Sequence, residues 1–418
     1  MADAPKGSRL SEAIILGALF LDLFGFGMLI PDIQYRAEKL GMVGWAIGAT
    51  LTVTFVIQLV ASPVWGRASD RVGRKLILVV CAGLSAAGLF TYGFANLPWI
   101  IVASRALSGL GGANVSIAQA YMADLTSAAV RTAAMGRIGA AVSAGLIAGS
   151  ASLALPMLHG VNVGIVAGTL SATGVCGLLF LPGRTGYAHA TLSAGVSGAK
   201  TKFRVFDLSL LRSLPALRSL VTVAAVAWFS LAMLEGTFGR LIERKPLDFH
   251  RREFGEVFAV EAVVGVLAQG VLLAWLARRT AAGPRLRSAY VAQGVGLALM
   301  PFVVSLCVLF GLSHRSQEGF PVATYPIALG VLFGVSALYA AGSGIANGTV
   351  NGLCSAATPE DRQGELFGLL QGARSVGFAI GPVLGGLLFD VNPRAPYLLA
   401  GGVCLAAAIL VRVPRPKP

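Results

Sequence analysis

The sequence changes from apolar to charged at Gly66-Arg67-Ala68-Ser69-Asp70-Arg71-Val72-Gly73-Arg74-Lys75, where five of ten side chains carry a charge. Apolar runs of about 20 residues, long enough to cross a bilayer, flank this stretch on both sides. Gly73 is free to take the positive φ of a tight turn, Asp70 is available to cap or pair, and basic side chains favour the membrane surface. We therefore expect a short charged turn between two membrane-spanning helices.

The composition of the whole chain supports this expectation. Of 418 residues, 56% are hydrophobic and 12% are charged, whereas soluble domains carry about 25% charged residues. A formal net charge of +14 would suggest a nucleic-acid partner on a soluble protein, but this composition argues strongly against a soluble globule. The 53 glycines fit close helix packing in lipid. We expect a polytopic membrane protein that binds no nucleic acid.

Short segments that are polar, charged or proline-containing divide the chain into apolar runs long enough to span a membrane. We predict twelve spans. They cover 12–33, 42–64, 76–94, 98–123, 133–155, 161–182, 215–238, 254–276, 288–311, 324–354, 365–388 and 396–413.

The longest interruption lies in the middle of the chain and has the composition of a linker. It divides six spans from six, so we predict an N-terminal bundle over 1–182, a cytoplasmic linker over 183–214 and a C-terminal bundle over 215–418. With both termini inside, the cytoplasmic segments hold 22 Lys and Arg residues against 9 in the outer loops. The positive-inside rule therefore favours cytoplasmic termini.

Span five in the first half and span eleven in the second half share a pattern of glycine spacing. Gly136, Gly145, Gly149 and Ser150 each have a counterpart 232 residues later, at Gly368, Gly377, Gly381 and Pro382. Transporters are commonly built from such duplicated bundles, with the substrate site between the repeats. Chance pairing in a Gly-rich chain is the alternative.

The spacing of Gly66 to Lys75 resembles the loop signature of the major facilitator superfamily. Three further stretches resemble the drug:proton antiporter branch of that family, particularly its tetracycline-efflux-like proteins: Leu21-Asp22-Leu23-Phe24-Gly25-Phe26-Gly27, Arg105-Ala106-Leu107-Ser108-Gly109 and Gly145-Leu146-Ile147-Ala148-Gly149. The resemblance implies an all-α major facilitator fold, in which twelve transmembrane helices form two pseudo-symmetric six-helix bundles.

The sequence departs from that branch at two informative positions. Ser150 stands where the fifth-span antiporter motif has proline, which weakens the inference of antiport. An intact-looking copy of the motif occurs instead in span eleven, from Gly377 to Gly386. Gly88 stands where tetracycline exporters carry an acidic residue, so tetracycline itself is a poor guess for the substrate.

Ionisable residues within spans cost about 2.5 to 3.5 kcal/mol each and are usually functional. Asp22 is the first candidate for a proton site, because burial between helices favours the protonated form of a carboxylate. Arg105 matches an arginine that the resemblance links to proton coupling; a tight helix contact explains it nearly as well, since Gly109, Gly112, Ser116 and Gln119 share its face. Glu235 and Glu261 are the second choices.

The remaining candidates have roles in gating, packing or substrate contact. For Arg374, whose helix face also carries glycines, packing and gating are favoured. The predicted gating loop comprises Gly66, Asp70, Arg71, Gly73 and Arg74. The helix-packing and gating set comprises Gly145, Gly149, Arg374, Gly377, Gly381 and Pro382. The substrate-cavity candidates are Gln58, Asn114, Gln119, Gln293, Asn347 and Asn351, each of which hydrogen bonding between helices explains equally well.

These features predict a proton-coupled exporter of amphipathic or lipophilic small molecules that works by alternating access. Uptake of a small solute by proton symport or uniport is the alternative that Ser150 favours. A receptor or assembly factor without transport activity is a third reading on the same fold. We expect a monomer in the bacterial inner membrane.

Nothing in the sequence indicates an enzyme, a cofactor or a metal site. The chain has no phosphate-binding loop of the Gly-x-x-x-x-Gly-Lys-Ser/Thr type and no nucleophile elbow. Its five cysteines fall within apolar runs and lack metal-ligand spacing.

Overall fold

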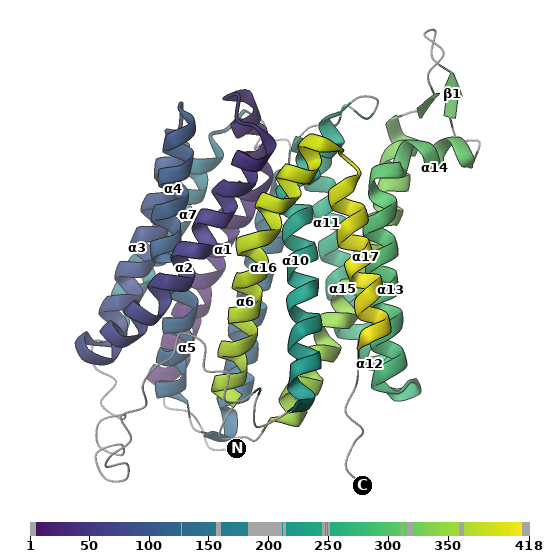
Figure 1. Ribbon diagram of the computed structural model, residues 1–418. Coiled ribbons are helices and arrows are strands. Elements are labelled where there is room, and N and C mark those ends of the chain that lie inside the picture. Colours follow the sequence, from purple (N-terminus) through teal and green to yellow (C-terminus); the bar gives the residue numbers. More distant parts are fainter. Residues whose placement is uncertain are drawn as a thin grey trace. The chain divides into compact units, whose positions relative to one another are not determined.

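The computed structural model describes residues 6–126, 128–155, 160–182, 211, 215–244, 247, 249, 251–310, 313–315, 321–323, 325–358 and 363–411. Within these residues the chain is almost entirely helical (Figure 1). The first half holds α1 (Lys6–Lys39), α2 (Gly44–Val72), α3 (Arg74–Gly93), α4 (Pro98–Gly111), α5 (Asn114–Leu125), α6 (Ala128–Ser152) and α7 (Val163–Leu179). The second half holds α10 (Pro215–Glu243), α11 (Arg251–Leu267), η2 (Ala268–Leu272), α12 (Leu273–Arg279), α13 (Ala282–Leu299), η3 (Met300–Phe302), α14 (Val303–Leu309), α15 (Tyr325–Ala357), α16 (Gln363–Val391) and α17 (Ala395–Leu410).

The described helices account for the predicted spans. Nine helical segments among the described residues are long and apolar enough to cross a membrane. Two shorter apolar helices, α7 and α17, and the 25-residue helix α6 occupy the other predicted positions. The polytopic all-α class is therefore confirmed. A short antiparallel strand pair, β1 (Ser313–Arg315) and β2 (Pro321–Ala323), interrupts the predicted loop between spans nine and ten.

Three predicted spans are not single regular helices. Span four breaks between α4 and α5 at Gly112, span eight contains the π-helical turn η2, and span nine contains the 3₁₀ turn η3. Pro301 explains the turn in span nine, because proline cannot donate a helical hydrogen bond. Neither charge nor hydropathy distinguishes the residues of η2 from the rest of span eight. The sequence pattern therefore predicted a continuous helix there.

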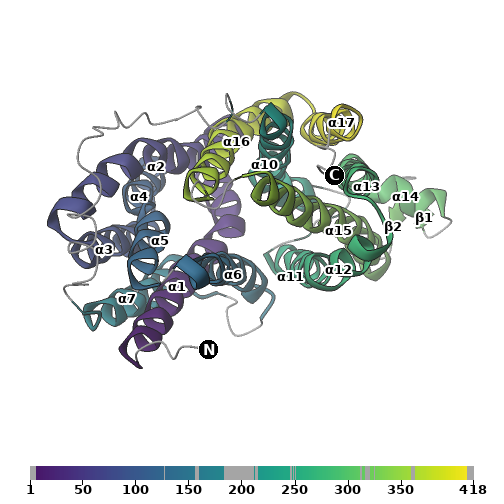
Figure 2. The same ribbon diagram turned by 90° about the horizontal axis from the view of Figure 1, so that it is seen from below.

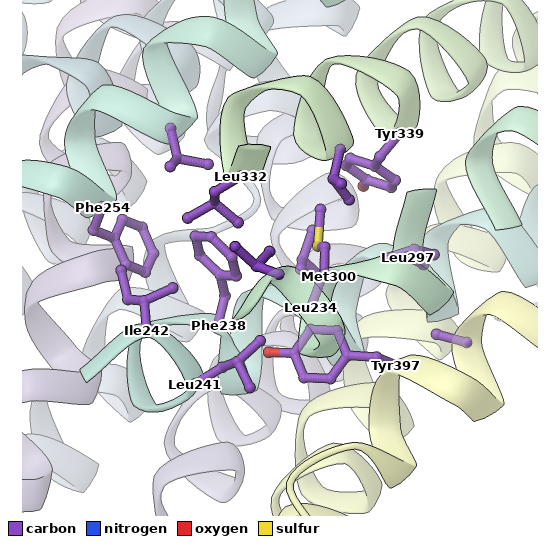
Figure 3. Close-up of a cluster of buried hydrophobic side chains, with 14 of the residues drawn as sticks. Leu234, Phe238, Leu241, Ile242, Phe254, Leu297, Met300, Leu332, Tyr339 and Tyr397 are labelled. Atoms are coloured by element: carbon purple, nitrogen blue, oxygen red, sulfur yellow. The ribbon is translucent and has the colours of Figure 1, made fainter. Parts of the chain in front are cut away.

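The chain divides into two compact units, and each is described by itself. Unit 1 comprises residues 1–32, 53–152 and 157–205, and unit 2 comprises 33–52, 153–156 and 206–418. The core of unit 1 includes Ile15, Leu78, Tyr121 and Met122. One core of unit 2 gathers Leu234, Phe238, Met300, Leu332 and Tyr397 (Figure 3).

The predicted linker over 183–214 lies outside the described residues apart from Leu211. The domain boundaries at 182 and 215 thus stay a prediction.

Candidate functional site

The Asp22 carboxylate lies at the meeting point of four helices in unit 1. Asp22 on α1 is 6% exposed, and its Oδ1 accepts hydrogen bonds from Ser85 Oγ of α3 at 2.7 Å and from Ser171 Oγ of α7 at 2.6 Å. Asn114 Nδ2 of α5 donates to Oδ2. Figure 2, which looks along the helices, shows α1, α3, α5 and α7 side by side. All three donors are neutral, so hydrogen bonding alone satisfies the carboxylate.

The break in span four places Asn114 beside Asp22. Gly111 packs so closely on α3 that an added Cβ would lie 2.5 Å from the Cys81 carbonyl oxygen, and α5 begins three residues later. A small cavity of about 10 Å³ adjoins the carboxylate, with Asp22, Asn114 and Ser171 among its lining residues. A space of this size has room for about one water molecule.

Arg105 forms a second buried polar group in unit 1. Its side chain on α4 is 0% exposed, and the guanidinium Cζ lies 5.6 Å from the centre of the Tyr92 ring. The Tyr92 hydroxyl in turn donates to Asp32 Oδ2 at 2.7 Å. Arg105 Nε donates to Ser104 Oγ at 3.3 Å, whereas neither Nη atom has a hydrogen-bond partner among the described residues.

Two residues of the face that the sequence predicts for Arg105, Gly109 and Gly112, contact α2. An added Cβ at Gly109 would lie 2.6 Å from the Thr54 carbonyl oxygen of α2, and Gln58 Nε2 donates to the Gly112 carbonyl at 2.7 Å. Ser116, beyond the break, is exposed. The predicted face from Arg105 to Gln119 thus crosses the turn between α4 and α5 and stays a prediction.

The charged loop joins α2 to α3 by a tight turn. Gly73 has φ 113°, a conformation that side chains with a Cβ rarely adopt. Arg74 Nε pairs with Asp124 Oδ2 at 3.2 Å, and its Nη1 donates to Ser69 Oγ at 2.8 Å. The loop thereby ties the start of span three to the end of span four. Gly66 faces open space and Arg71 is exposed, while the Asp70 side chain lies outside what the structure describes.

Glycines in α6 bring this helix against α1 in unit 1. An added Cβ at Gly145 would lie 2.5 Å from the Phe20 carbonyl oxygen, and one at Gly149 would overlap the Phe24 carbonyl. Ser150 Oγ donates to the Gly27 carbonyl oxygen at 2.8 Å. The serine that replaces the motif's proline thus forms a hydrogen bond between the two helices.

The corresponding glycines of α16 lie against α10 in unit 2. An added Cβ at Gly377 would lie 2.8 Å from the Phe229 amide nitrogen, and one at Gly381 would lie 2.7 Å from the Ala232 Cβ. Pro382 Cα would lie 3.0 Å from a Cβ at Gly236. Gly145 and Gly149 therefore occupy contacts between α6 and α1 that correspond to those of Gly377 and Gly381 between α16 and α10.

The unit 2 charges are spread over three helices. Glu235 of α10 is 5% exposed and interacts electrostatically with Arg374 of α16. The Arg374 Cζ lies 4.6 Å from the Trp228 ring centre and 5.5 Å from that of Phe378. Glu261 of α11 lies beside Ser336 of α15, and its buried Oε1 has no hydrogen-bond partner among the described residues.

Three of the six predicted cavity residues, Gln58, Asn114 and Gln119, belong to unit 1, and Gln293, Asn347 and Asn351 belong to unit 2. Asn114 binds Asp22, and Gln58 makes the contact with Gly112 described above. Gln293 is fully buried, and neither of its side-chain polar atoms has a partner among the described residues. Gln119 and Asn347 are half-buried, and Asn351 is exposed.

Sequence reasoning missed several residues of these networks. Ser85, Ser171 and Tyr92 were not singled out, because an isolated hydroxyl in an apolar helix carries no distinctive signal. Asp32 fell at the end of a predicted span, whereas α1 continues to Lys39 and buries it. Finding the polar residues that face Asp22 would have required knowing which helices pack against α1.

Gly88 also has a structural explanation. An added Cβ there would lie 2.8 Å from the Ser108 amide nitrogen and 2.9 Å from the Ser104 carbonyl oxygen. The close contact between α3 and α4 leaves no room for the acidic side chain that tetracycline exporters have at this position.

A helical membrane protein with buried, hydrogen-bonded charges of this kind has the construction of a solute transporter. The model of the Major Facilitator Superfamily matches residues 15–315 and 304–418, so the chain belongs to that family. It is a secondary transporter rather than an enzyme, and the resemblance stated from its motifs is confirmed.

Curated relatives match the chain over nearly its full length. The tetracycline resistance protein of class D from Salmonella ordonez is 25% identical over 96% of this chain and 97% of its own length. Multidrug resistance protein 1 of Bacillus subtilis (strain 168) is also 25% identical, over 97% of this chain and 96% of its own.

Solved structures share the fold. The human organic anion transporter MFSD10 has a TM-score of 0.61 and 20% identity, covering 98% of this chain and all of that one. The nucleoside transporter NupG has a TM-score of 0.68 and 15% identity, covering 96% and 97%. These likenesses establish the major facilitator fold.

Proposed function

We propose that the protein exports amphipathic or lipophilic small molecules in exchange for protons, by alternating access. The main observation that supports this proposal is the buried Asp22 carboxylate, to which three neighbouring helices each supply a neutral hydrogen-bond donor. Two distant relatives named for tetracycline and multidrug resistance support export as the direction.

The donor set around Asp22 suits a group that gains and loses a proton. A hydroxyl can donate to an ionised carboxylate, and it can rotate to accept a hydrogen bond from a protonated one. Ser85 and Ser171 can therefore serve both states. No ion pair holds Asp22 in its charged form among the described residues, so proton uptake breaks no salt bridge.

The driving force suffices for transport against a modest gradient. One proton moving inward yields about 2.3 kcal/mol from 100 mV and about 1.4 kcal/mol from one pH unit. The sum of about 3.7 kcal/mol supports a concentration ratio of several hundred. Proton-coupled export therefore needs no ATP.

Reconstitution into liposomes tests this proposal. Purified protein is placed in vesicles containing a pH-sensitive dye, and tetracycline, ethidium and 1-naphthoate are added under an imposed pH gradient. At least one solute should move only with the gradient and shift the dye signal, and Asp22→Asn should abolish that coupling. Ser116→Ala, at an exposed hydroxyl, is the control. Gradient-driven transport by Asp22→Asn at the wild-type rate would contradict the role of Asp22.

Glu235, Glu261 and Arg105 are proposed as further coupling residues. Glu261 is the stronger of the two carboxylates, because its buried Oε1 has no partner among the described residues. In the same vesicles Glu261→Gln should lower the number of protons moved per solute. An unchanged ratio would exclude Glu261 from coupling.

Uptake of a small solute is the second candidate function. Ser150 favours it, because this residue replaces the antiporter proline and bonds to α1. The direction of proton movement on adding solute separates the two: antiport moves protons opposite to the solute, and symport moves them with it.

We further propose a monomer in the bacterial inner membrane with both termini in the cytoplasm, and bundles over 1–182 and 215–418 joined by a linker. Labelling of single cysteines placed at either terminus from each side of sealed vesicles checks the orientation. Light scattering of the purified protein checks the monomer.

A further inference from the structure

The Arg105 guanidinium has unused hydrogen-bonding capacity in the interior of unit 1. Its side chain is 0% exposed, yet Nη1 and Nη2 have no partner among the described residues. Arginine carries five N–H donors in a planar fork and stays charged in proteins. A buried cation left unpaired is costly, so its retention points to a partner that the protein chain itself does not supply.

Asp22 and Asp32, two buried carboxylates of unit 1, have other partners. Asp22 accepts from Ser85, Asn114 and Ser171, and Asp32 accepts from the Tyr92 hydroxyl. No ion pair among the described residues includes Arg105. The Tyr92 ring lies 5.6 Å from the guanidinium carbon, and this cation–π contact supplies no oxygen acceptor to the Nη atoms.

A second unpaired polar group lies one helical turn from Arg105. Ser108 Oγ is buried and has no hydrogen-bond partner among the described residues. Ser108 Oγ lies so close to Gly88 of α3 that an added Cβ at Gly88 would overlap it. The Arg105 guanidinium has two unpaired nitrogens, a fork that suits an oxyanion, and Ser108 carries a further unpaired hydroxyl on the next turn of α4.

We propose that Arg105 binds the anionic group of the transported solute, a carboxylate or phosphate carried on an apolar body. This inference rests on the proposed function, of which it names the substrate class. The guanidinium fork matches the two oxygens of such a group, and Ser108 carries a further unpaired donor one turn along the same helix. Because Arg105 is fully buried, the solute reaches it in a conformation in which the surrounding helices have parted.

The charge of such a solute changes the energetics of transport. Export of a monoanion with entry of one proton moves two charges in the same electrical sense, whereas export of a neutral solute moves one. About 59 mV changes the accumulation ratio tenfold for one charge. The same voltage step should therefore change the ratio for an anionic solute about a hundredfold.

Binding of matched probes to the purified protein tests the proposal. The probes are 1-naphthoate, 1-naphthyl phosphate and the neutral 1-naphthamide, and the readout is thermal stabilisation, since a ligand of the folded state raises apparent stability. One of the two anions should stabilise the wild type at concentrations at least about tenfold lower than the amide. The phosphate and carboxylate arms identify which oxyanion the site prefers.

Variants then assign that preference to Arg105. Arg105→Gln should weaken anion binding about 10- to 100-fold and leave amide binding unchanged, whereas Arg105→Lys should keep part of the anion preference. Arg137→Gln, at a half-exposed arginine paired with Glu12, is the matched control and should behave as wild type.

Equal stabilisation of the wild type by amide and anions would overturn the proposal, as would an unchanged anion preference in Arg105→Gln. The comparison of probes needs only the wild-type protein, so a variant that fails to fold leaves the test intact. Transport of ethidium coupled through Asp22, without any anion preference, would refute this inference and leave the proposed function standing.

Discussion

The contact between α1 and α6 makes a quantitative prediction for Gly145→Ala. The added Cβ would lie 2.5 Å from the Phe20 carbonyl oxygen and 3.1 Å from the Phe24 amide nitrogen. Ordinary van der Waals contact begins at 3.4 Å, so the two helices must separate by about 0.9 Å. The obstructing atoms belong to a helical backbone and have no rotamer to change.

Gly139→Ala on the same helix is the matched control. A Cβ at Gly139 meets nothing within 4 Å. Both variants gain the helix propensity of alanine over glycine, about 0.8 to 1.0 kcal/mol, and this gain cancels in their difference. The difference therefore isolates the overpacking cost, about 1 to 3 kcal/mol.

The assay is thermal unfolding of the two purified variants in the same detergent. For a folded unit of about 150 to 250 residues, each kcal/mol shifts Tm by about 2 to 4 °C. Gly145→Ala should accordingly melt about 2 to 12 °C below Gly139→Ala. If the two melt within 1 °C of each other, the α1–α6 contact is not as close as the argument requires.

Two further predictions concern the charged loop and the α3–α4 contact. In a double-mutant cycle, Arg74→Gln and Asp124→Asn should show a coupling free energy below about 1 kcal/mol, because the two side chains are 25% and 23% exposed; a coupling well above that value would indicate a buried pair. Gly88→Asp should lower the apparent Tm relative to Gly83→Asp, where an added Cβ meets nothing within 4 Å; equal melting temperatures would contradict the explanation given for Gly88.

The helical fold could be predicted from the sequence because membrane spans follow from length and hydropathy. Each span satisfies its backbone hydrogen bonds internally, so its identification needs no knowledge of its neighbours. The spacing of the charged turn from Gly66 to Lys75 further indicated to which transporter family the chain belongs. Interruptions within spans were not predictable in this way: η2 contains no proline, and the break at Gly112 depends on the close approach of Gly111 to α3.

The candidate site was predictable only in part. Asp22, Arg105 and Asn114 could be singled out because charges and amides are rare in apolar helices. Ser85 and Ser171 could not, since serine is common at helix contacts in membranes. The donors to Asp22 lie 63, 92 and 149 residues further along the chain, so only the packing of α3, α5 and α7 on α1 brings them together.

The replacement of proline by Ser150 acquires a different meaning from this packing. In unit 2, Pro382 lies against Gly236 and, lacking an N–H group, cannot complete the helical bond to the carbonyl of residue 378. In unit 1, Ser150 keeps its backbone donor and uses its hydroxyl to bond the Gly27 carbonyl. Gly145 and Gly149 remain against α1 as Gly377 and Gly381 remain against α10. The departure from the motif therefore preserves the close helix contact. In unit 1 a hydrogen bond between two helices stabilises this contact, whereas in unit 2 a proline within α16 stands at the corresponding position.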